Sequence, residues 1–368
     1  MQRDGLTRRD AVKAAGIGIS SLAATGILGA RAAAGASSGV GAAQPSTPAS
    51  PKQNAPVPTT GGIAAGPTPN GEQAFGHYRF KVGENVQAWS ISDGTGRFSP
   101  LQPLVAPQAS PEQFKQVLEE NLADPTGATI AFNVVLLKLG AETVLIDSGS
   151  GEREAAQTGW LLKNLAQAGV KPSDITGVVI THAHGDHIQG LFKSDDRLVF
   201  PNARVFVHTN EHDFWTGNPD LSKMGVPEQA RAGMSAAAAK AFATLRKEGK
   251  LELIKGGDKL VGGLTIVDTP GHTPGHISVV VDAPGAGGPL FVMSDIVHHH
   301  VAMFARPEWT IAFDTDPTLA VQTRRRVFDM IVSEKMRAHG YHMPWPGLGR
   351  IGRRGEGYWW GIEGWTWS

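Results

Sequence analysis

The stretch THAHGDHIQG, residues 181–190, constrains this chain more than any other part of its sequence. Three histidines and an aspartate fall within six positions: His182, His184, Asp186 and His187. Such side chains are poorly suited to a packed core, whereas imidazole nitrogens and carboxylate oxygens are common ligands of divalent cations. In a turn at Gly185, the first two histidines point the same way and the other two side chains lie across the turn. Each pair could therefore begin a separate cation site.

The motif directly follows ITGVVIT, residues 175–181, a β-branched run typical of a strand buried on both faces. Loops at strand ends in α/β sheets often carry functional sites, because the rigid strand aims the loop. Alternating apolar residues predict further strands, at 77–94 with a turn at 83–85, at 130–147 with a turn at 140–142, and at 203–209, 264–270, 276–283 and 289–295. Helical spacing is found at 160–170 and in a mostly helical insertion over about 210–250. The pattern predicts a strand-rich α/β fold.

A closed cation site needs more ligands than one pair provides, and later strand ends can supply them. TPGHTPGH, residues 269–276, brings His272 and His276 after a predicted strand. Asp295 ends the apolar run FVMSD, and a carboxylate can bridge two cations through its two oxygens. AHGYHMPWPG, residues 338–347, adds two further histidines, His339 and His342.

Composition excludes several other kinds of protein. The chain has 368 residues with 34 basic and 34 acidic side chains, so it lacks the basic excess that nucleic-acid binding would need. It contains no cysteine, which excludes disulfides, thiolate ligands and a cysteine nucleophile. No G-x-S-x-G elbow occurs in a strand–turn–helix context.

The N-terminal part predicts export. Arg8 and Arg9 precede an apolar run over about 14–30, and small residues follow it, as in a twin-arginine signal. A membrane anchor is the alternative, but the run is short and glycine-rich for a bilayer span. We therefore expect a signal peptide at 1–34, a Pro/Ser/Gly/Ala-rich disordered linker at 35–73, and a folded domain at 74–368. The expected partner is the twin-arginine export machinery, and the expected location is periplasmic or secreted.

The ordered series H-x-H-x-D-H, TPGHTPGH, Ser-Asp and a final histidine resembles the metallo-β-lactamase fold superfamily. The resemblance implies an αββα sandwich with a single catalytic domain. More narrowly, SDIVHHHVAMFARPEW (294–309) and the segments YHMPWPGLGRI and GEGYWW (341–360) are similar to the methyl parathion hydrolase and lactonase branch.

The resemblance also implies the ligands of two divalent cations. One cation would be held by His182, His184 and His276, and the other by Asp186, His187 and His342, with Asp295 shared. Asp147 would support the histidine loop from behind, and His272 would be supporting structure rather than a ligand. Zinc is the leading candidate, and manganese, iron and cobalt remain open.

Four further positions are less constrained. Some related lactonases carry a tyrosine three residues after the bridging aspartate, where this chain has His298, so His298 is a candidate catalytic residue. Trp345 is a candidate wall of the substrate pocket. His208 and Glu211 are expected only to end a strand and begin a helix.

The function implied by the resemblance is hydrolysis of a lactone, an ester or an organophosphate triester by a hydroxide held between two cations, with Asp186 as a proton donor. The expected partner is a small-molecule substrate, and a homodimer is possible. An iron-dependent, sulfur dioxygenase-like oxidoreductase and a non-catalytic metal-binding protein remain the alternatives.

Overall fold

The computed structural model describes residues 76–152, 157–285 and 288–364. The expected signal peptide (1–34) and linker (35–73) lie outside these ranges. No helix within them is both long enough and apolar enough to span a bilayer.

The strands in these ranges form two seven-stranded sheets, each arranged in chain order. The first sheet contains β1 (His77–Val82), β2 (Val86–Phe98), β3 (Ala128–Leu139), β4 (Glu142–Ile146), β5 (Gly177–Ile180), β6 (Arg204–His208) and β7 (Leu251–Ile254). The second contains β8 (Lys259–Leu260), β9 (Leu264–Asp268), β10 (Ile277–Val281), β11 (Leu290–Val292), β12 (Arg337–His339), β13 (Leu348–Arg354) and β14 (Gly357–Ile362). Strands β4 to β7 pair in parallel, and β11 pairs in parallel with β12.

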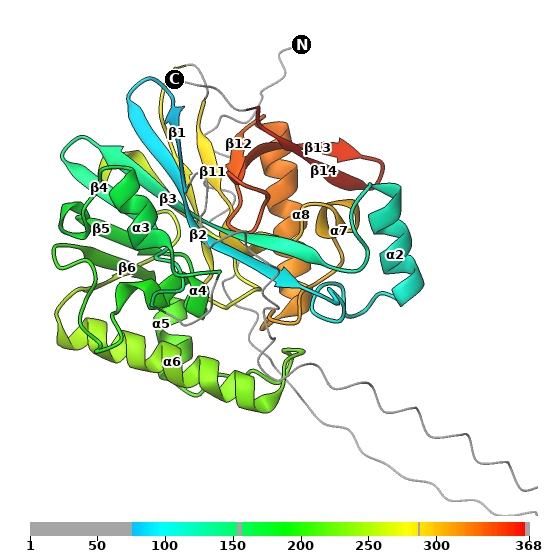
Figure 1. Cartoon of the computed structure of the whole chain (residues 1–368), viewed down its shortest axis with the longest axis horizontal. Coiled ribbons are helices and arrows are strands. Elements are labelled where there is room, and N and C mark those ends of the chain that lie inside the picture. The colour runs from blue at the N-terminus through cyan, green and yellow to red at the C-terminus, as the bar shows by residue number, and fades with distance from the viewer. Residues whose placement is uncertain (1–75, 153–156, 286–287, 365–368) are drawn as a thin grey trace, which may run out of the picture.

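Helices cover the outer face of each sheet (Figure 1). Those on the first sheet are α3 (Leu161–Gln167), α4 (Gly185–Ile188), α5 (Thr209–Thr216) and α6 (Glu228–Lys247). Those on the second are α7 (Ala302–Ala305) and α8 (Pro317–Ser333), and α2 (Pro111–Glu120) packs against α7. The expectation of a two-sheet α/β sandwich is confirmed.

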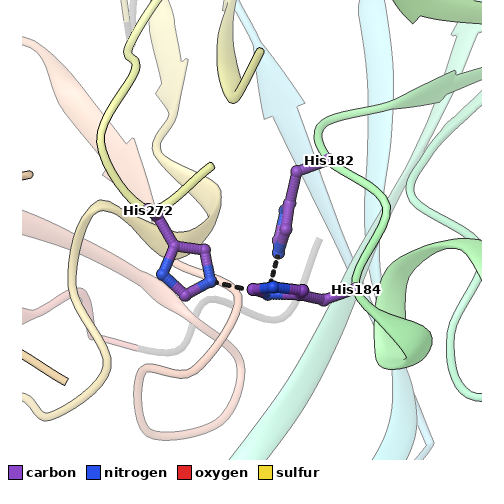
Figure 2. Close-up of side chains that lie close together, drawn as sticks. All are labelled: His182, His184 and His272. Atoms are coloured by element: carbon purple, nitrogen blue, oxygen red, sulfur yellow. Dashed lines mark hydrogen bonds between the residues drawn. The ribbon is translucent and has the colours of Figure 1, made fainter. Parts of the chain in front are cut away.

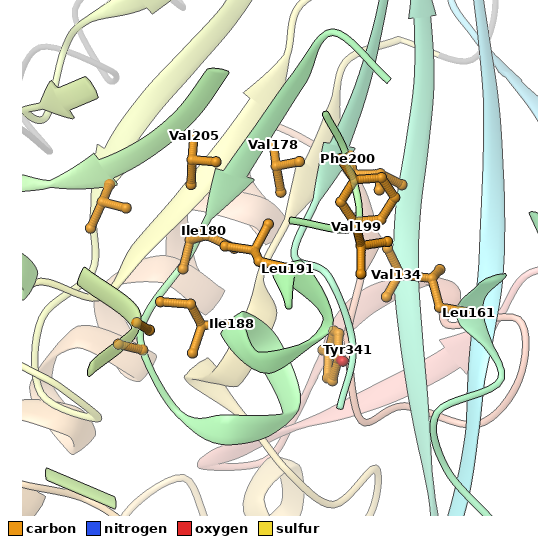
Figure 3. Close-up of a cluster of buried hydrophobic side chains, with 14 of the residues drawn as sticks. Val134, Leu161, Val178, Ile180, Ile188, Leu191, Val199, Phe200, Val205 and Tyr341 are labelled. Atoms are coloured by element: carbon orange, nitrogen blue, oxygen red, sulfur yellow. The ribbon is translucent and has the colours of Figure 1, made fainter. Parts of the chain in front are cut away.

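The molecule has four layers: helices, the first sheet, the second sheet and helices. An apolar cluster fills each of the three spaces between them, since neighbouring residues of a strand point to opposite faces of its sheet. In β5, Val178 and Ile180 face the helices, where they share an apolar cluster with Leu161 of α3 (Figure 3). Val179, between them in sequence, faces the second sheet and shares a cluster with Val279 of β10. The outer face of the second sheet buries Phe291, among other residues, against α8 and α7. β5 is thus buried on both faces, as its sequence predicted.

The main differences from the sequence predictions lie near the ends of the folded part. Helix α2 was not predicted, although Ser110 and Gln113 form a capping box at its start. The C-terminal hairpin of β13 and β14 was not predicted either. On this hairpin Trp360 is buried, whereas Trp359 remains 47% exposed.

Candidate metal centre

The loop that carries His182 and His184, here called the histidine loop (181–187), follows β5 and leads into the short helix α4. His184 precedes the first residue of α4, and its carbonyl accepts a hydrogen bond from the backbone N–H of His187 at 3.0 Å. The turn separates the side chains of the motif into two sets, as the sequence indicated. His182 and His184 form a group with His272, and Asp186 and His187 form one with His342; His182 and His187 also form a group with Asp295, so the two sets adjoin.

Three imidazoles converge to form the first group (Figure 2). His184 Nδ1 lies 3.1 Å from His182 Nε2 and 2.9 Å from His272 Nε2. All three side chains are buried. Lone pairs of neutral imidazoles that face one another at these distances are favourable only where a proton or a cation lies between them.

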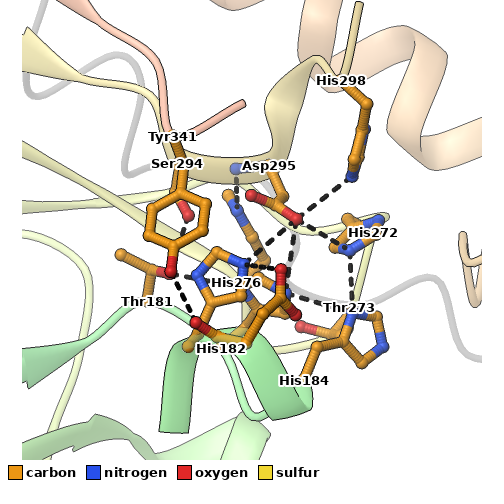
Figure 4. Close-up of polar contacts among 12 residues, drawn as sticks. Thr181, His182, His184, His272, Thr273, His276, Ser294, Asp295, His298 and Tyr341 are labelled. Carbon is orange, nitrogen blue, oxygen red and sulfur yellow. Dashed lines mark hydrogen bonds and ion pairs between the residues drawn. The ribbon is translucent and has the colours of Figure 1, made fainter. Parts of the chain in front are cut away.

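The second group contains one carboxylate and two imidazoles. Asp186 Oδ2 lies 3.4 Å from His187 Nε2 and 3.6 Å from His342 Nε2. Asp295 contacts both groups, and Figure 4 shows its carboxylate facing His272 and His298. Its Oδ2 is 3.2 Å from His342 Nε2 and 3.5 Å from His272 Nε2. One carboxylate can therefore serve both groups.

Hydrogen bonds behind the rings aim their nitrogen lone pairs into the centre. The Nδ1 atoms of His187, His272 and His342 lie 2.9, 2.8 and 3.0 Å from oxygens of Asp147, Asp314 and Ala131, respectively. A ring that donates from Nδ1 in its neutral form carries its lone pair on Nε2. His187 Nε2 and Asp295 Oδ1 are buried and have no hydrogen-bond partner. This donor set fits a divalent cation in each group.

The structure exchanges the positions expected for His272 and His276. His272, predicted as support, points Nε2 into the first group. His276, predicted as a ligand, lies outside the groups that could hold an ion among the described residues. Its Nδ1 contacts the Thr269 carbonyl at 3.0 Å, and its Nε2 accepts from the backbone N–H of Asp295 at 3.2 Å. With both nitrogens engaged, His276 holds the two loops together and has no lone pair left for a cation.

Charge distinguishes the two groups. Burial lowers the pKa of His182, His184 and His272 well below the usual value. Burial also lowers the pKa of His187, but the carboxylates of Asp295, Asp186 and Asp147 outweigh it and raise the pKa well above the usual value. The pKa of His342 is raised in the same way by Asp295 and Asp186.

The two groups open onto an apolar cavity of about 230 Å³. Its apolar wall consists of Phe98, Leu101, Leu104, Val105, Ile130, Phe132, Met234, Ile311 and Phe313. The polar end includes Asp186, Asp295 and His298, and no lysine or arginine lines it among the described residues. His298 Nε2 lies 3.1 Å from Asp295 Oδ2, and its buried Nδ1 has no hydrogen-bond partner. Trp345, expected at the pocket wall, does not line this cavity.

Histidines near the final motif have separate places. His342 belongs to the second group, whereas His339 lies on β12 with its Nε2 3.2 Å from Ser90 Oγ. His208, as expected, ends β6 and accepts a hydrogen bond from Asn210 N at the start of α5.

Besides Asp314, two further residues that support the site were missed by sequence reasoning. Tyr341 is buried, and its ring lies 4.1 Å from that of His187. Glu211, expected only to begin a helix, is fully buried. Its carboxylate accepts from Ala183 N at 2.8 Å, from Trp215 Nε1 at 2.7 Å and from Thr273 Oγ1 at 2.6 Å. Glu211 therefore joins the histidine loop to the loop that carries His272.

Known proteins are similar to this chain over much of its length. Residues 132–288 match the family model of the metallo-beta-lactamase superfamily. Metallo-beta-lactamase domain-containing protein 1 of Xenopus laevis is 30% identical over 215 residues, which cover 58% of this chain and 74% of that protein. A probable metallo-hydrolase of Bacillus subtilis, YqjP, is 30% identical over 46% of this chain and 55% of its own length.

Two solved structures extend the likeness to the whole sandwich. AidC, a dizinc quorum-quenching lactonase solved with a product, has a TM-score of 0.74 and 29% identity, over 79% of this chain and 98% of its own. AbOPH, a hydrolase of the beta-lactamase superfamily, has a TM-score of 0.72 and 31% identity, over 80% of this chain and 100% of its own.

Proposed function

Because the chain belongs to the metallo-beta-lactamase superfamily, we propose that it is a hydrolase with two cation sites that cleaves a small lactone, ester or organophosphate triester. One observation carries the proposal: seven histidine and aspartate side chains from loops of both sheets form overlapping groups that could hold cations, at the polar end of an apolar cavity. Relatives described as a dizinc lactonase and as hydrolases support this reaction type.

The proposed ligands follow the geometry. The first cation would be held by His182, His184 and His272, the second by Asp186, His187 and His342, and Asp295 would be shared. Bound zinc, or manganese, iron or cobalt, would supply Lewis acidity and lower the pKa of a nearby water.

The residues of the chain supply the proton chemistry. Burial alone would raise the pKa of Asp186, but His187 and His342 outweigh it and hold the pKa below the usual value. The carboxylate is therefore ionised at neutral pH, and its side chain is 28% exposed. It can accept a proton from the attacking water and pass it to the leaving oxygen. We also propose that His298, from the same polar end, contacts the substrate with the face of its ring or with Nδ1, while its Nε2–H donates to Asp295 Oδ2.

The cavity sets what such a substrate looks like. Its wall is apolar and carries no cationic side chain among the described residues, so it favours an uncharged substrate with an apolar group. A lactone, an ester and a phosphotriester all meet this description.

Elemental analysis beside a hydrolysis panel tests the function. The panel would include an acyl-homoserine lactone, an aryl ester and a phosphotriester. We expect about two equivalents of metal, hydrolysis that stops on chelation and returns with metal, and no hydrolysis by Asp295→Ala. Full-rate hydrolysis by metal-stripped protein would refute the proposal. Oxygen consumption with a thiol substrate and no hydrolysis would instead favour the oxidoreductase, and metal binding with neither activity would favour a non-catalytic protein.

A further inference from the structure

We propose that Asp314 is a positioning residue for the first cation site and that it connects this site to the wall of the substrate cavity. The inference rests on the proposed function, because it takes His272 as a cation ligand. Asp314 is 1% exposed, and its Oδ1 lies 2.8 Å from His272 Nδ1.

The first step concerns the orientation of one ring. A carboxylate that accepts a hydrogen bond from Nδ1–H fixes both the tautomer and the rotation of an imidazole. In this orientation His272 Nε2 faces His184 Nδ1 at 2.9 Å. His276 in the same loop contacts the Thr269 carbonyl through Nδ1, and its Nε2 accepts from the backbone N–H of Asp295. Asp314 therefore orients the one histidine of this loop whose Nε2 is left for a cation.

The second step concerns where Asp314 itself is held. Its Oδ2 accepts from Ile311 N at 3.2 Å, and its own N–H donates to the Ile311 carbonyl at 3.0 Å. These two bonds close a turn, residues 311–314. The side chains of Ile311 and Phe313 on this turn line the cavity. One turn thus carries both the carboxylate behind His272 and part of the substrate wall.

The third step concerns the stiffness of the connection. Just after the turn, Thr315 N donates to the His272 carbonyl at 3.0 Å and Asp316 N to the Gly271 carbonyl at 2.9 Å. The segment before the turn is held from α8, where the buried Arg324 donates to the carbonyls of Pro307 and Trp309 at 2.8 and 2.7 Å. A shift of the cavity wall is therefore transmitted to the ring of His272.

The test measures cation affinity rather than turnover. Two successive equivalents of Co²⁺ are titrated into the metal-free full chain against a competing chelator. The ring N–H of each ligand imidazole is followed by its paramagnetically shifted NMR signal. In Asp314→Asn, we expect one equivalent to bind about 10- to 100-fold more weakly, and one imidazole N–H signal to move or vanish. The other equivalent should keep its affinity within about threefold.

Asp93→Asn is the matched control for loss of a buried carboxylate. Asp93 is buried, accepts from Ser150 N at 2.7 Å and Leu161 N at 3.0 Å, and belongs to none of the cation groups. If Asp93→Asn lowers the melting temperature as much as Asp314→Asn but weakens neither equivalent, the effect of Asp314 is specific to His272. If Asp314→Asn leaves both affinities unchanged, or weakens both equally as Asp93→Asn does, the inference is overturned.

Ile311→Ala tests the connection to the cavity. Ile311 contributes to the wall, and both of its hydrogen bonds with Asp314 are made by its backbone. We expect it to weaken the same Co²⁺ equivalent by about threefold or more, and to add nothing in the Asp314→Asn background. Additive losses in the double variant would exclude the connection. Wild-type protein that binds no Co²⁺ would instead overturn the proposed function itself.

Discussion

The hydroxyl of Tyr341 donates a hydrogen bond to the backbone carbonyl of Asp186 at 2.5 Å. Tyr341 follows β12 in the second sheet, whereas Asp186 follows β5 in the first, so this bond joins the two loops that bear the second cation group. Tyr341→Phe keeps the ring against His187 and removes only the bond. We expect a stability loss of about 1–3 kcal/mol, because a buried carbonyl loses its partner. Urea unfolding measures it, and an unchanged midpoint would show that water replaces the hydroxyl.

The exchanged positions of His272 and His276 give opposite expectations for two similar variants. His272→Ala should lower the metal content from about two equivalents to about one and abolish hydrolysis, because the first group loses a ligand. His276→Ala should retain both equivalents and unfold at lower urea concentration, since it breaks the contacts to Thr269 and Asp295 N. Elemental analysis of both purified variants decides the matter. Loss of metal from His276→Ala alone would restore the ligand set predicted from the sequence.

The two cation groups should respond differently to acid. In the metal-free protein the imidazoles of the first group have lowered pKa values, so they are neutral at neutral pH and binding displaces no proton. His187 and His342 have raised pKa values and must lose their protons, so affinity at the second group falls as the pH falls. The expected slope is about tenfold per pH unit for each proton displaced. Zinc titrations at pH 6, 7 and 8 measure both slopes, and equal slopes would contradict this account.

Glu211 should be needed for stability as well as for the site. Glu211→Gln replaces an acceptor oxygen with an NH₂ group among the donors of Ala183, Trp215 and Thr273. We expect a loss of about 2–3 kcal/mol, since hydrogen bonds to a buried charge are broken and a donor is left unpaired. Chemical denaturation of the metal-free protein isolates this effect from metal binding. A glutamine variant as stable as the wild type would show that the carboxylate is protonated in the folded protein.

The twin-arginine signal remains a prediction that the sequence alone carries. Replacement of both Arg8 and Arg9 by lysine should leave the protein folded, active and unprocessed in the cytoplasm. Cell fractionation followed by a hydrolysis assay checks this outcome. Normal export of the double variant would exclude the twin-arginine route, and a single Arg8→Lys change provides the milder comparison.

The local part of the site could be predicted from the sequence, because neighbours in a turn must be neighbours in space. His182, His184, Asp186 and His187 needed only the strand before them and the turn at Gly185. The long-range part was harder. TPGHTPGH offers two histidines in the same local context, and they differ through contacts with distant residues. Asp314 lies 42 positions after His272 and nothing in its own sequence marks it.

The same reasoning explains two other differences. Glu211 follows a strand and begins a helix, which is an ordinary place for a surface glutamate, and only tertiary packing buries it. Trp345 lies close to His342 in sequence, and closeness in sequence predicted a place at the cavity wall that its side chain does not occupy. The layers of the fold were more predictable, because alternating apolar residues fix which face of a strand is buried.

The placement of the ligands on both sheets has a mechanical consequence. His182 and His184 follow a strand of the first sheet, while His272 follows a strand of the second, so a cation held by all three would clasp the two halves of the sandwich together. Separation of the two sheets on unfolding would then require the cation to dissociate first. The metal-bound protein should resist proteases and heat longer than the metal-free protein, even where both have the same backbone structure.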